Sequence, residues 1–524
     1  MFMNTFIKNY RVAVLCKMTA IVVSVSSCTQ DFEELNTDKT KLTVLTSTEL
    51  PYLFSKAQSA SSYAYWRYQV AQNLFSDLYS QYFATSATYF PSDRYNIRFD
   101  WLQWHWIPIY TEAVPQLKTL LKVTDANSAE NALAKIMWVY AFHRLTDYYG
   151  PVPYFKAGEP ASSVAYDGQK EIYYDMFTKL DEAVKVLNAN NGKTPYGSFD
   201  LMYNGDVSKW IKFANTLRLR LALRISKVEP AKAKSEAESA VSSGVMLTTA
   251  DDAYMLKSEN GGDFNGLAGI SGWNEFRMSA SMESVLKGYG DPRMAVYFQP
   301  AVGTGKYDGL RNGLLPSQLN ISGNGNDDNS NVGTRWTKWS GSSWGGQNTT
   351  PQNIMHAAEA YFLRAEGALN GWNMKGATQD LYEKGIETSM RQWGINDAAA
   401  IAAYQKSAAT PIPPMDGINS PAMASISVKW GGTVAVQREQ IGTQKWLALF
   451  PDGIEAWAEF RRTRFPKLYP VVNSDNADLP SGTFIRRIPF LVLEKNTNAA
   501  AVKAAEALLG SPDKPTTPLW WDKN

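Results

Sequence analysis

Two neighbouring segments decide the fold: HAAEAYFLRAEGALNGW at residues 356–372 and ATQDLYEKGIETSMRQW at residues 377–393. Each carries apolar residues at the three- and four-residue spacing of an amphipathic helix. A four-residue turn separates them, and the small residues Ala358, Ala365 and Ala368 alternate with larger ones. The sequence therefore predicts two helices, over 353–372 and 377–393, that pack closely against each other.

Helical spacing extends over most of the remaining chain. The predicted helices cover residues 51–83, 101–121, 132–149, 169–188, 207–227, 231–243, 434–450, 453–464 and 499–509. The pair at 356–393 resembles one tetratricopeptide unit, although no regular repeat of about 34 residues recurs elsewhere. We therefore expect a mostly α-helical protein, built on a tetratricopeptide-like scaffold with divergent units.

Residues 248–350 have a different composition, because glycine, asparagine and serine replace the helical pattern. Such a stretch predicts long loops with few regular elements. Loops of this length are usually functional or disordered. Because this one carries several tryptophans and disordered linkers are poor in aromatic residues, we expect an ordered, ligand-binding insertion.

The first 27 residues have the features of a secretory signal. Lys8, Arg11 and Lys17 precede the apolar run MTAIVVSVSS at 18–27, which is shorter than the roughly 20 residues needed to cross a bilayer. The run ends at Cys28, and residues 25–28 resemble the lipobox of bacterial lipoproteins. We therefore predict a signal at 1–27, a lipid on Cys28 and a tether at 28–45. An ordinary cleaved signal with an incidental cysteine is the alternative.

The mature protein differs in charge from its precursor. The whole chain carries a net charge of +2, which becomes −1 when the three basic residues of the signal are removed. No basic run remains, so nucleic acid is not an expected partner. Cys16 is removed with the signal and Cys28 is used by the lipid, so the body at 46–524, expected to be one domain, has no disulfide.

Several segments in order resemble the SusD/RagB family of surface nutrient-binding lipoproteins from Bacteroidetes. They are FEELN at 32–36, RLTDYYGPVPY at 144–154, EAYFLRAE at 359–366, QKW at 444–446, GIEAW at 453–457, FRRT at 460–463 and RIPF at 487–490. Pro151 and Leu491 depart from the family's usual residues, but neither lies in the suspected binding loops. The resemblance implies an outer-membrane, lipid-anchored protein that binds ligand without catalysis. The acidic residues after Cys28 are similar to a signal for display on the cell surface.

The residues themselves offer little catalytic chemistry. His105, His143 and His356 lie far apart, and none belongs to the two-histidine motif of a zinc helix. Asp327 and Asp328 could offer oxygen ligands to calcium, but the EF-hand spacing is absent and a solvated loop is the alternative. We therefore expect no enzyme activity, no catalytic residues, no metal site and no cofactor.

Aromatic residues are the best candidates for ligand binding, because 13% of the chain is aromatic and sugar rings pack their C–H faces on aromatic faces. An early cluster holds Tyr89 and Phe90, and a late one lies in the insertion. We predict the following ligand-binding residues: Tyr89, Phe90, Trp273, Trp336, Trp339, Trp344, Asp77 and Arg94. The alternative for the tryptophans is a place in the core.

The resemblance, taken with these residues, predicts a glycan-binding lipoprotein that passes an oligosaccharide to a SusC-like TonB-dependent transporter. Two alternatives stay open at this point. One is a surface glycoside hydrolase, which needs only two suitably placed carboxylates that a sequence cannot single out. The other is a helical-repeat lipoprotein that binds peptide or acts as a protein scaffold.

Overall fold

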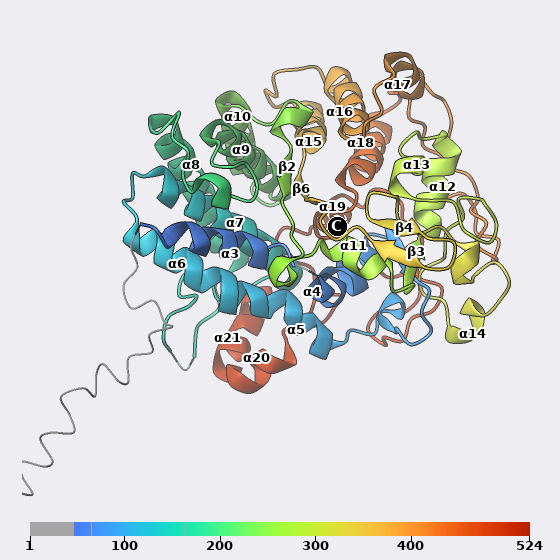
Figure 1. Ribbon diagram of the computed structural model, residues 1–524, viewed down its shortest axis with the longest axis horizontal. Helices are drawn as coiled ribbons and strands as arrows, with labels where there is room; N and C mark the ends of the chain where they lie inside the picture. Colours follow the sequence, from blue (N-terminus) through green and yellow to red (C-terminus); the bar gives the residue numbers. More distant parts are fainter. Residues whose placement is uncertain (1–46, 64, 162) are drawn as a thin grey trace, which may run out of the picture. The chain divides into compact units, whose positions relative to one another are not determined.

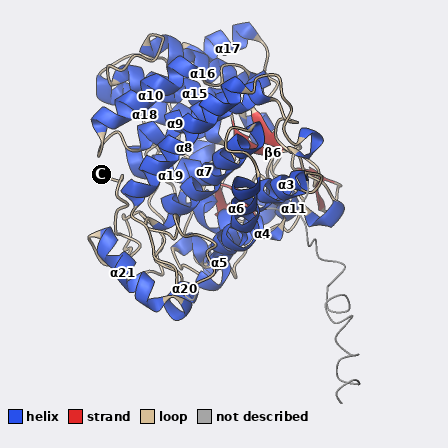
Figure 2. Ribbon diagram, turned by 90° about the vertical axis from the view of Figure 1, so that its left-hand side faces the viewer, coloured by secondary structure: helices blue, strands red, loops and turns tan. Residues whose placement is uncertain are grey.

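Helices make up most of the structure, with a few short strands between them (Figure 2). The computed structural model describes residues 47–524, except residues 64 and 162. The predictions for the signal, Cys28 and the tether therefore lie outside the described residues. No described helix is both long enough and apolar enough to cross a membrane.

The N-terminal half follows the predicted helices closely. Its α-helices are α3 (Leu50–Ala60), α4 (Trp66–Tyr68), α5 (Phe99–Pro108), α6 (Val114–Val123), α7 (Ala129–Tyr149), α8 (Gln169–Ala189), α9 (Val207–Arg224) and α10 (Pro230–Ser243). The side chain of Ser128 accepts a hydrogen bond from the Asn131 amide and so caps α7. Gly150 ends that helix with a φ of 84°, a conformation that suits glycine.

The segment predicted as one helix over 51–83 is divided in the structure. After α3, Tyr63 and Tyr65 adopt positive φ angles, and the chain then continues through α4 into the π-helix η1 (Gln69–Asp77). A second π-helix, η3 (Ile109–Ala113), joins α5 to α6 next to the proline that ends α5. Apolar periodicity predicted the helical character of these segments but not the change of direction between them.

The insertion at 248–350 holds more regular structure than its composition suggests. It contains the helices α11 (Gly266–Ser271), α12 (Ala280–Tyr289), α13 (Met294–Tyr297) and α14 (Pro316–Leu319). The helix α12 begins at a serine cap, Ser279, and ends at Gly290 in the left-handed conformation. Both signals involve single residues, so the glycine-rich composition of the surrounding sequence did not reveal this helix.

The structure has three antiparallel strand pairs, two of which fasten the insertion to the rest of the chain. The strands are β1 (Phe83–Thr85), β2 (Ala253–Met255), β3 (Phe276–Met278), β4 (Thr337–Trp339), β5 (Trp344–Gly346) and β6 (Gln352–Met355). The pair β1–β3 joins the insertion to the early aromatic segment, β2–β6 closes the base of the insertion, and β4–β5 is a hairpin within it.

The C-terminal half is again helical. Its helices are α15 (Ala357–Leu369), α16 (Thr378–Gln392), α17 (Ala398–Gln405), α18 (Val434–Leu449), α19 (Gly453–Thr463), α20 (Val492–Thr497) and α21 (Ala499–Leu509). Helices α15 and α16 pack against each other, as the opening segments predict. A Cβ atom at Gly385 of α16 would lie 2.9 Å from the ring of Phe362 in α15, so only glycine permits this approach. The pairs α7–α8 and α9–α10 pack in the same way (Figure 1).

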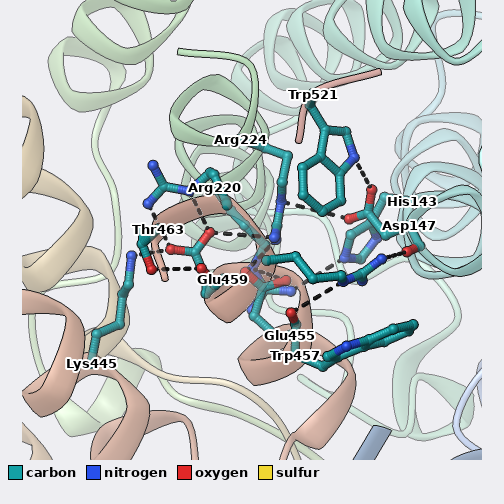
Figure 3. A network of polar contacts seen from close by, with 12 residues as sticks. His143, Asp147, Arg220, Arg224, Lys445, Glu455, Trp457, Glu459, Thr463 and Trp521 are labelled. Carbon is teal, nitrogen blue, oxygen red and sulfur yellow. Dashed lines mark hydrogen bonds and ion pairs between the residues drawn. The ribbon is translucent and has the colours of Figure 1, made fainter. Parts of the chain in front are cut away.

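Buried ion pairs join these helices to one another (Figure 3). The guanidinium of Arg220 in α9 lies 2.6 Å from the carboxylate of Glu359 in α15, and that of Arg224 lies 2.5 Å from Glu455 in α19. Asp147 in α7 accepts hydrogen bonds from the indole of Trp521 at 2.9 Å. Burial of a charge is costly unless a partner offsets it, so these contacts fix how the helices are arranged.

The network is formally balanced. Its five cations and five carboxylates, all shielded from solvent, are Arg220, Arg224, Lys445, Arg461, Arg462, Asp147, Glu359, Glu366, Glu455 and Glu459. Burial, opposed by Arg220 and Arg224, raises the pKa of Glu455 to about 7. Seven of the ten lie within segments on which the family resemblance rests, so those motifs describe the scaffold and not the ligand site.

Candidate functional site

The β4–β5 hairpin presents two tryptophans to one another. Trp339 and Trp344 are cross-strand partners, and their ring centroids are 5.1 Å apart. Trp339 keeps 38% of its surface exposed, whereas Trp344 is half-buried beneath it. A short hairpin alone is marginally stable, so the packing around it must hold these rings in place.

The end of α11 supports the hairpin and adds a third indole. A Cβ atom at Gly272 would lie 3.0 Å from the carbonyl oxygen of Trp344, so the helix end and strand β5 touch. The next residue, Trp273, is 39% exposed and meets the ring of Tyr65 edge-on at 5.9 Å. In Figure 1 α11 is drawn next to β4, in agreement with the contacts of α11 with β5, the other strand of the hairpin.

Tyr89 reaches the same region through Glu275, two residues beyond Trp273. Its hydroxyl donates a hydrogen bond to Oε1 of Glu275, and the other carboxylate oxygen accepts one from Gln69 at 2.5 Å. Burial and the contact with Glu275 raise the pKa of Tyr89 to about 12, so the phenol remains protonated and can donate. The ring itself is 65% exposed.

We refer to Tyr65, Tyr89, Trp273, Trp339 and Trp344 as the aromatic surface. It combines exposed ring faces with the carboxylate of Glu275, whose place is fixed by two hydrogen bonds. Exposed apolar patches rimmed by polar groups usually mark binding surfaces. Ring faces suit the C–H faces of sugars, and a fixed carboxylate suits their hydroxyl groups.

Two of the aromatic residues predicted to contact the ligand, Trp336 and Phe90, are buried in the structure and not exposed. Trp336 is only 1% exposed, and its ring packs on Trp393 and Phe450 at 5.6 and 5.7 Å. Phe90 is also buried, against Trp101. Trp336 holds to the core the loop that carries Trp339, and Phe90 does the same for the loop that carries Tyr89.

The predicted polar contacts Asp77 and Arg94 are buried as well. Asp77 ends η1 and accepts hydrogen bonds from Tyr68 at 2.8 Å and Gln72 at 3.1 Å. Burial, opposed by these bonds, raises its pKa to about 7. Arg94 pairs with Asp475 at 2.8 Å and donates to the carbonyl of Leu314. These side chains hold loops together and do not face solvent.

The histidines and the acidic loop show no constellation for catalysis. His105 stacks on Tyr148 at 3.8 Å, and burial lowers the pKa values of His105 and His143 well below the usual range. Asp328 accepts hydrogen bonds from the backbone amides of Gly323 and Gly325. Across residues 47–524, apart from the two that are not described, no three histidine, cysteine or acidic side chains are grouped to hold a metal.

Sequence reasoning missed Tyr65, Gln69 and Glu275. Tyr65 lies in the aromatic run YWRY at 65–68, which was available as a signal. Its backbone has φ 51° and ψ −132°, a costly conformation for a non-glycine residue that is often found at functional sites. Glu275 has no local signal, because only the pairing of β1 with β3 brings it beside Tyr89.

Comparison with known proteins adds independent information. The model of the SusD-like family, described as SusD and RagB outer membrane lipoprotein, matches residues 28–522. A chitin-binding SusD homologue from Flavobacterium johnsoniae is 36% identical, with a TM-score of 0.83 over 91% of this chain and 99% of its own. A SusD homologue from Bacteroides uniformis is 33% identical, with a TM-score of 0.81 and coverages of 91% and 99%.

A third structure, described as a chitin-binding protein, is 30% identical over 91% of this chain and all of its own, with a TM-score of 0.75. No curated protein matches the chain. The matches confirm the predicted helical fold and the resemblance stated above, and the family is one of binding lipoproteins that are not enzymes. The chain therefore belongs to the SusD-like family of outer membrane lipoproteins.

Proposed function

We propose that this protein binds an oligosaccharide of the chitin type on the aromatic surface. The observation that carries the proposal is the exposure of Trp273, Trp339 and Tyr89, together with the hydrogen bond that holds Tyr89 to the carboxylate of Glu275, two residues after Trp273. Ring faces stack on the C–H faces of N-acetylglucosamine units, and the carboxylate accepts from their hydroxyls. Two similar structures are described as chitin-binding, which supports this choice of glycan.

The bound glycan passes to a SusC-like TonB-dependent transporter in the outer membrane, and the lipid on Cys28 keeps the protein on the cell surface. Membership of the SusD-like family supports both steps. Retention of a matching transporter when the lipoprotein is isolated from mildly solubilised membranes tests the partnership. Recovery of the lipoprotein alone under conditions that keep other outer-membrane complexes intact would contradict it.

Affinity electrophoresis tests the choice of ligand. The lipoprotein in detergent should be retarded in gels that contain soluble chitin derivatives and should migrate freely in gels that contain starch. No new reducing ends should form during prolonged incubation with the same glycan. Retardation by starch alone would overturn the chitin assignment, and steady release of reducing ends would favour the hydrolase alternative.

A further inference from the structure

A hollow opens beside the aromatic surface and has no assigned role. It encloses about 270 Å³ between α3, the turn into α4, η3 and the loop at residues 260–263. Its polar lining includes Lys56, Ser59, Arg67, Glu112 and Asp263. This volume is slightly below the usual range for small-ligand sites, roughly 300–1,000 Å³, so the hollow has room for one small group.

Tyr65 links this hollow to the aromatic surface. It lines the hollow, while its ring contacts Trp273 at 5.9 Å and Phe264 at 4.8 Å. Its strained backbone is held in place, because its amide donates to the carbonyl of Phe264 at 3.1 Å. A Cβ atom at Gly269 would come within 2.9 Å of its ring. A ligand on the aromatic surface can therefore continue over Tyr65 into the hollow.

The charged groups of the hollow are fixed by one another. Glu112 lies 2.5 Å from Nζ of Lys56 and 2.7 Å from the guanidinium of Arg67. Asp263 accepts a hydrogen bond from Ser59 at 2.7 Å and lies 3.2 Å from Nζ of the buried Lys257. Two carboxylates and their flanking donors thus have set positions, and neighbouring sugar hydroxyls, which both donate and accept, suit such an arrangement.

The hollow also has an aromatic wall. Trp66 is 39% exposed and lines it, and its ring is held edge-on by Trp104 at 4.8 Å. The guanidinium of Arg67 lies 5.6 Å from the ring of Trp104 and 5.9 Å from that of Trp66. The indole of Trp66, fixed by Trp104 and flanked by hydrogen-bonding groups, suits the binding of one sugar ring.

We propose that this hollow is a further subsite, which holds one more sugar residue of the glycan bound on the aromatic surface. The inference rests on the proposed function. Its consequence is that the protein measures chain length: a disaccharide is held by the aromatic surface alone, whereas a longer chain also contacts Trp66 and the Lys56–Glu112–Arg67 group.

Titration calorimetry with the lipoprotein in detergent tests this consequence, with the disaccharide and the hexasaccharide of N-acetylglucosamine as probes. Glu112→Gln should weaken hexasaccharide binding about tenfold, as expected for one lost charge-assisted hydrogen bond, and leave disaccharide binding unchanged. Lys56→Met, at a half-exposed lysine, should act in the same direction. The matched control is Glu182→Gln, since Glu182 pairs with Lys135 at 2.8 Å on α7 and α8, and it should change neither affinity.

Melting temperatures measured on the same samples show whether each variant is folded. If folded Glu112→Gln and Lys56→Met bind both probes as the parent does, or lose both equally, the subsite is overturned while the proposed function stands. If the parent itself binds neither probe, both the proposed glycan binding and the additional subsite are refuted.

Discussion

Trp339 and Trp344 face each other across the β4–β5 hairpin, with their ring centroids 5.1 Å apart and their planes at 53°. Paired strands place such partners on one face of the ribbon. The hairpin is tied down at its base, where the Gln347 amide donates to the carbonyl of Trp336 at 2.8 Å. The three tryptophans of this loop therefore divide between one anchor and two rings that face the site.

This division predicts that truncation of Trp336 destabilises the fold strongly, whereas truncation of Trp339 hardly changes its stability. Trp336→Ala empties a fully buried position, so it should lower the free energy of unfolding by about 3–5 kcal/mol. Trp339→Ala removes a partly exposed ring and should leave the melting temperature nearly unchanged. Thermal unfolding of the two variants beside the parent checks both, and equal losses would show that the hairpin rings are also structural.

The buried ion network predicts a large cost for losing a single partner. Arg462 lies 2.6 Å from Glu366 and 2.7 Å from Glu459, and all three are shielded from solvent. Arg462→Met leaves one carboxylate charge in excess and should cost about 3–5 kcal/mol of stability. In contrast, Arg391→Met breaks a partly exposed pair with Glu387, which keeps Lys384 as a second partner, and should shift the urea midpoint little. Similar midpoints for the two variants would contradict this account of the core.

Asp77 predicts a specific dependence of stability on pH. Its pKa is about 7 in the folded protein because of burial, against roughly 3.9 for an unfolded aspartate. The folded state therefore binds the proton more tightly. Asp77 therefore contributes to the free energy of unfolding. This contribution is fully present below pH ~4 and is lost as the pH rises through about 7.

Asp77→Asn removes this titration. We therefore compare the free energies of unfolding of the parent and the variant. The difference, parent minus variant, should fall between pH ~4 and ~7 and then level off. The control is Asp100→Asn, because the hydrogen bond from Arg98 lowers the pKa of Asp100 and reverses the sign. The stabilising contribution of Asp100 should be present at neutral pH and be lost only in acid. Urea unfolding across the pH range measures both, and a flat difference for Asp77→Asn would refute its raised pKa.

Cys28 predicts the membrane attachment. Cys28→Ala removes the proposed site of acylation, so metabolic labelling with a radioactive fatty acid should disappear and the protein should leave the membrane fraction. Cys16→Ala is the matched control, since Cys16 lies within the predicted signal and should leave labelling intact. Unchanged labelling of the Cys28→Ala variant would place the lipid elsewhere.

The sequence predicted the scaffold better than the site. Apolar periodicity is repeated over whole helices, so α7 to α10, α15, α16, α18 and α19 could be predicted to within a few residues, whereas the short helix α17 was not predicted. The residues of the family motifs, such as Asp147 and Glu366, are fixed by burial in the ion network. They identify the fold but carry no information about a ligand.

The aromatic surface was only partly predictable, because exposure depends on contacts between distant segments. Trp336 and Trp339 lie three residues apart in the same polar loop, yet Trp336 packs against the distant residues Trp393 and Phe450 whereas Trp339 stays partly exposed. Asp77 looked like a ligand for hydroxyl groups, but Gly453 of α19 closes over it: a Cβ atom there would lie 2.1 Å from its carboxylate. Neither contact has a signal in the local sequence.

Glycan binding by the aromatic surface is tested most directly by titrating the lipoprotein with the hexasaccharide of N-acetylglucosamine, as the parent and as Trp339→Ala. Truncation of a stacked aromatic ring at a binding centre costs about 2 kcal/mol or more, which is roughly thirtyfold in affinity. The account predicts saturable binding by the parent and a loss of about that size in a variant with an unchanged melting temperature. Equal affinity of the two proteins, with the variant fully folded, would contradict it.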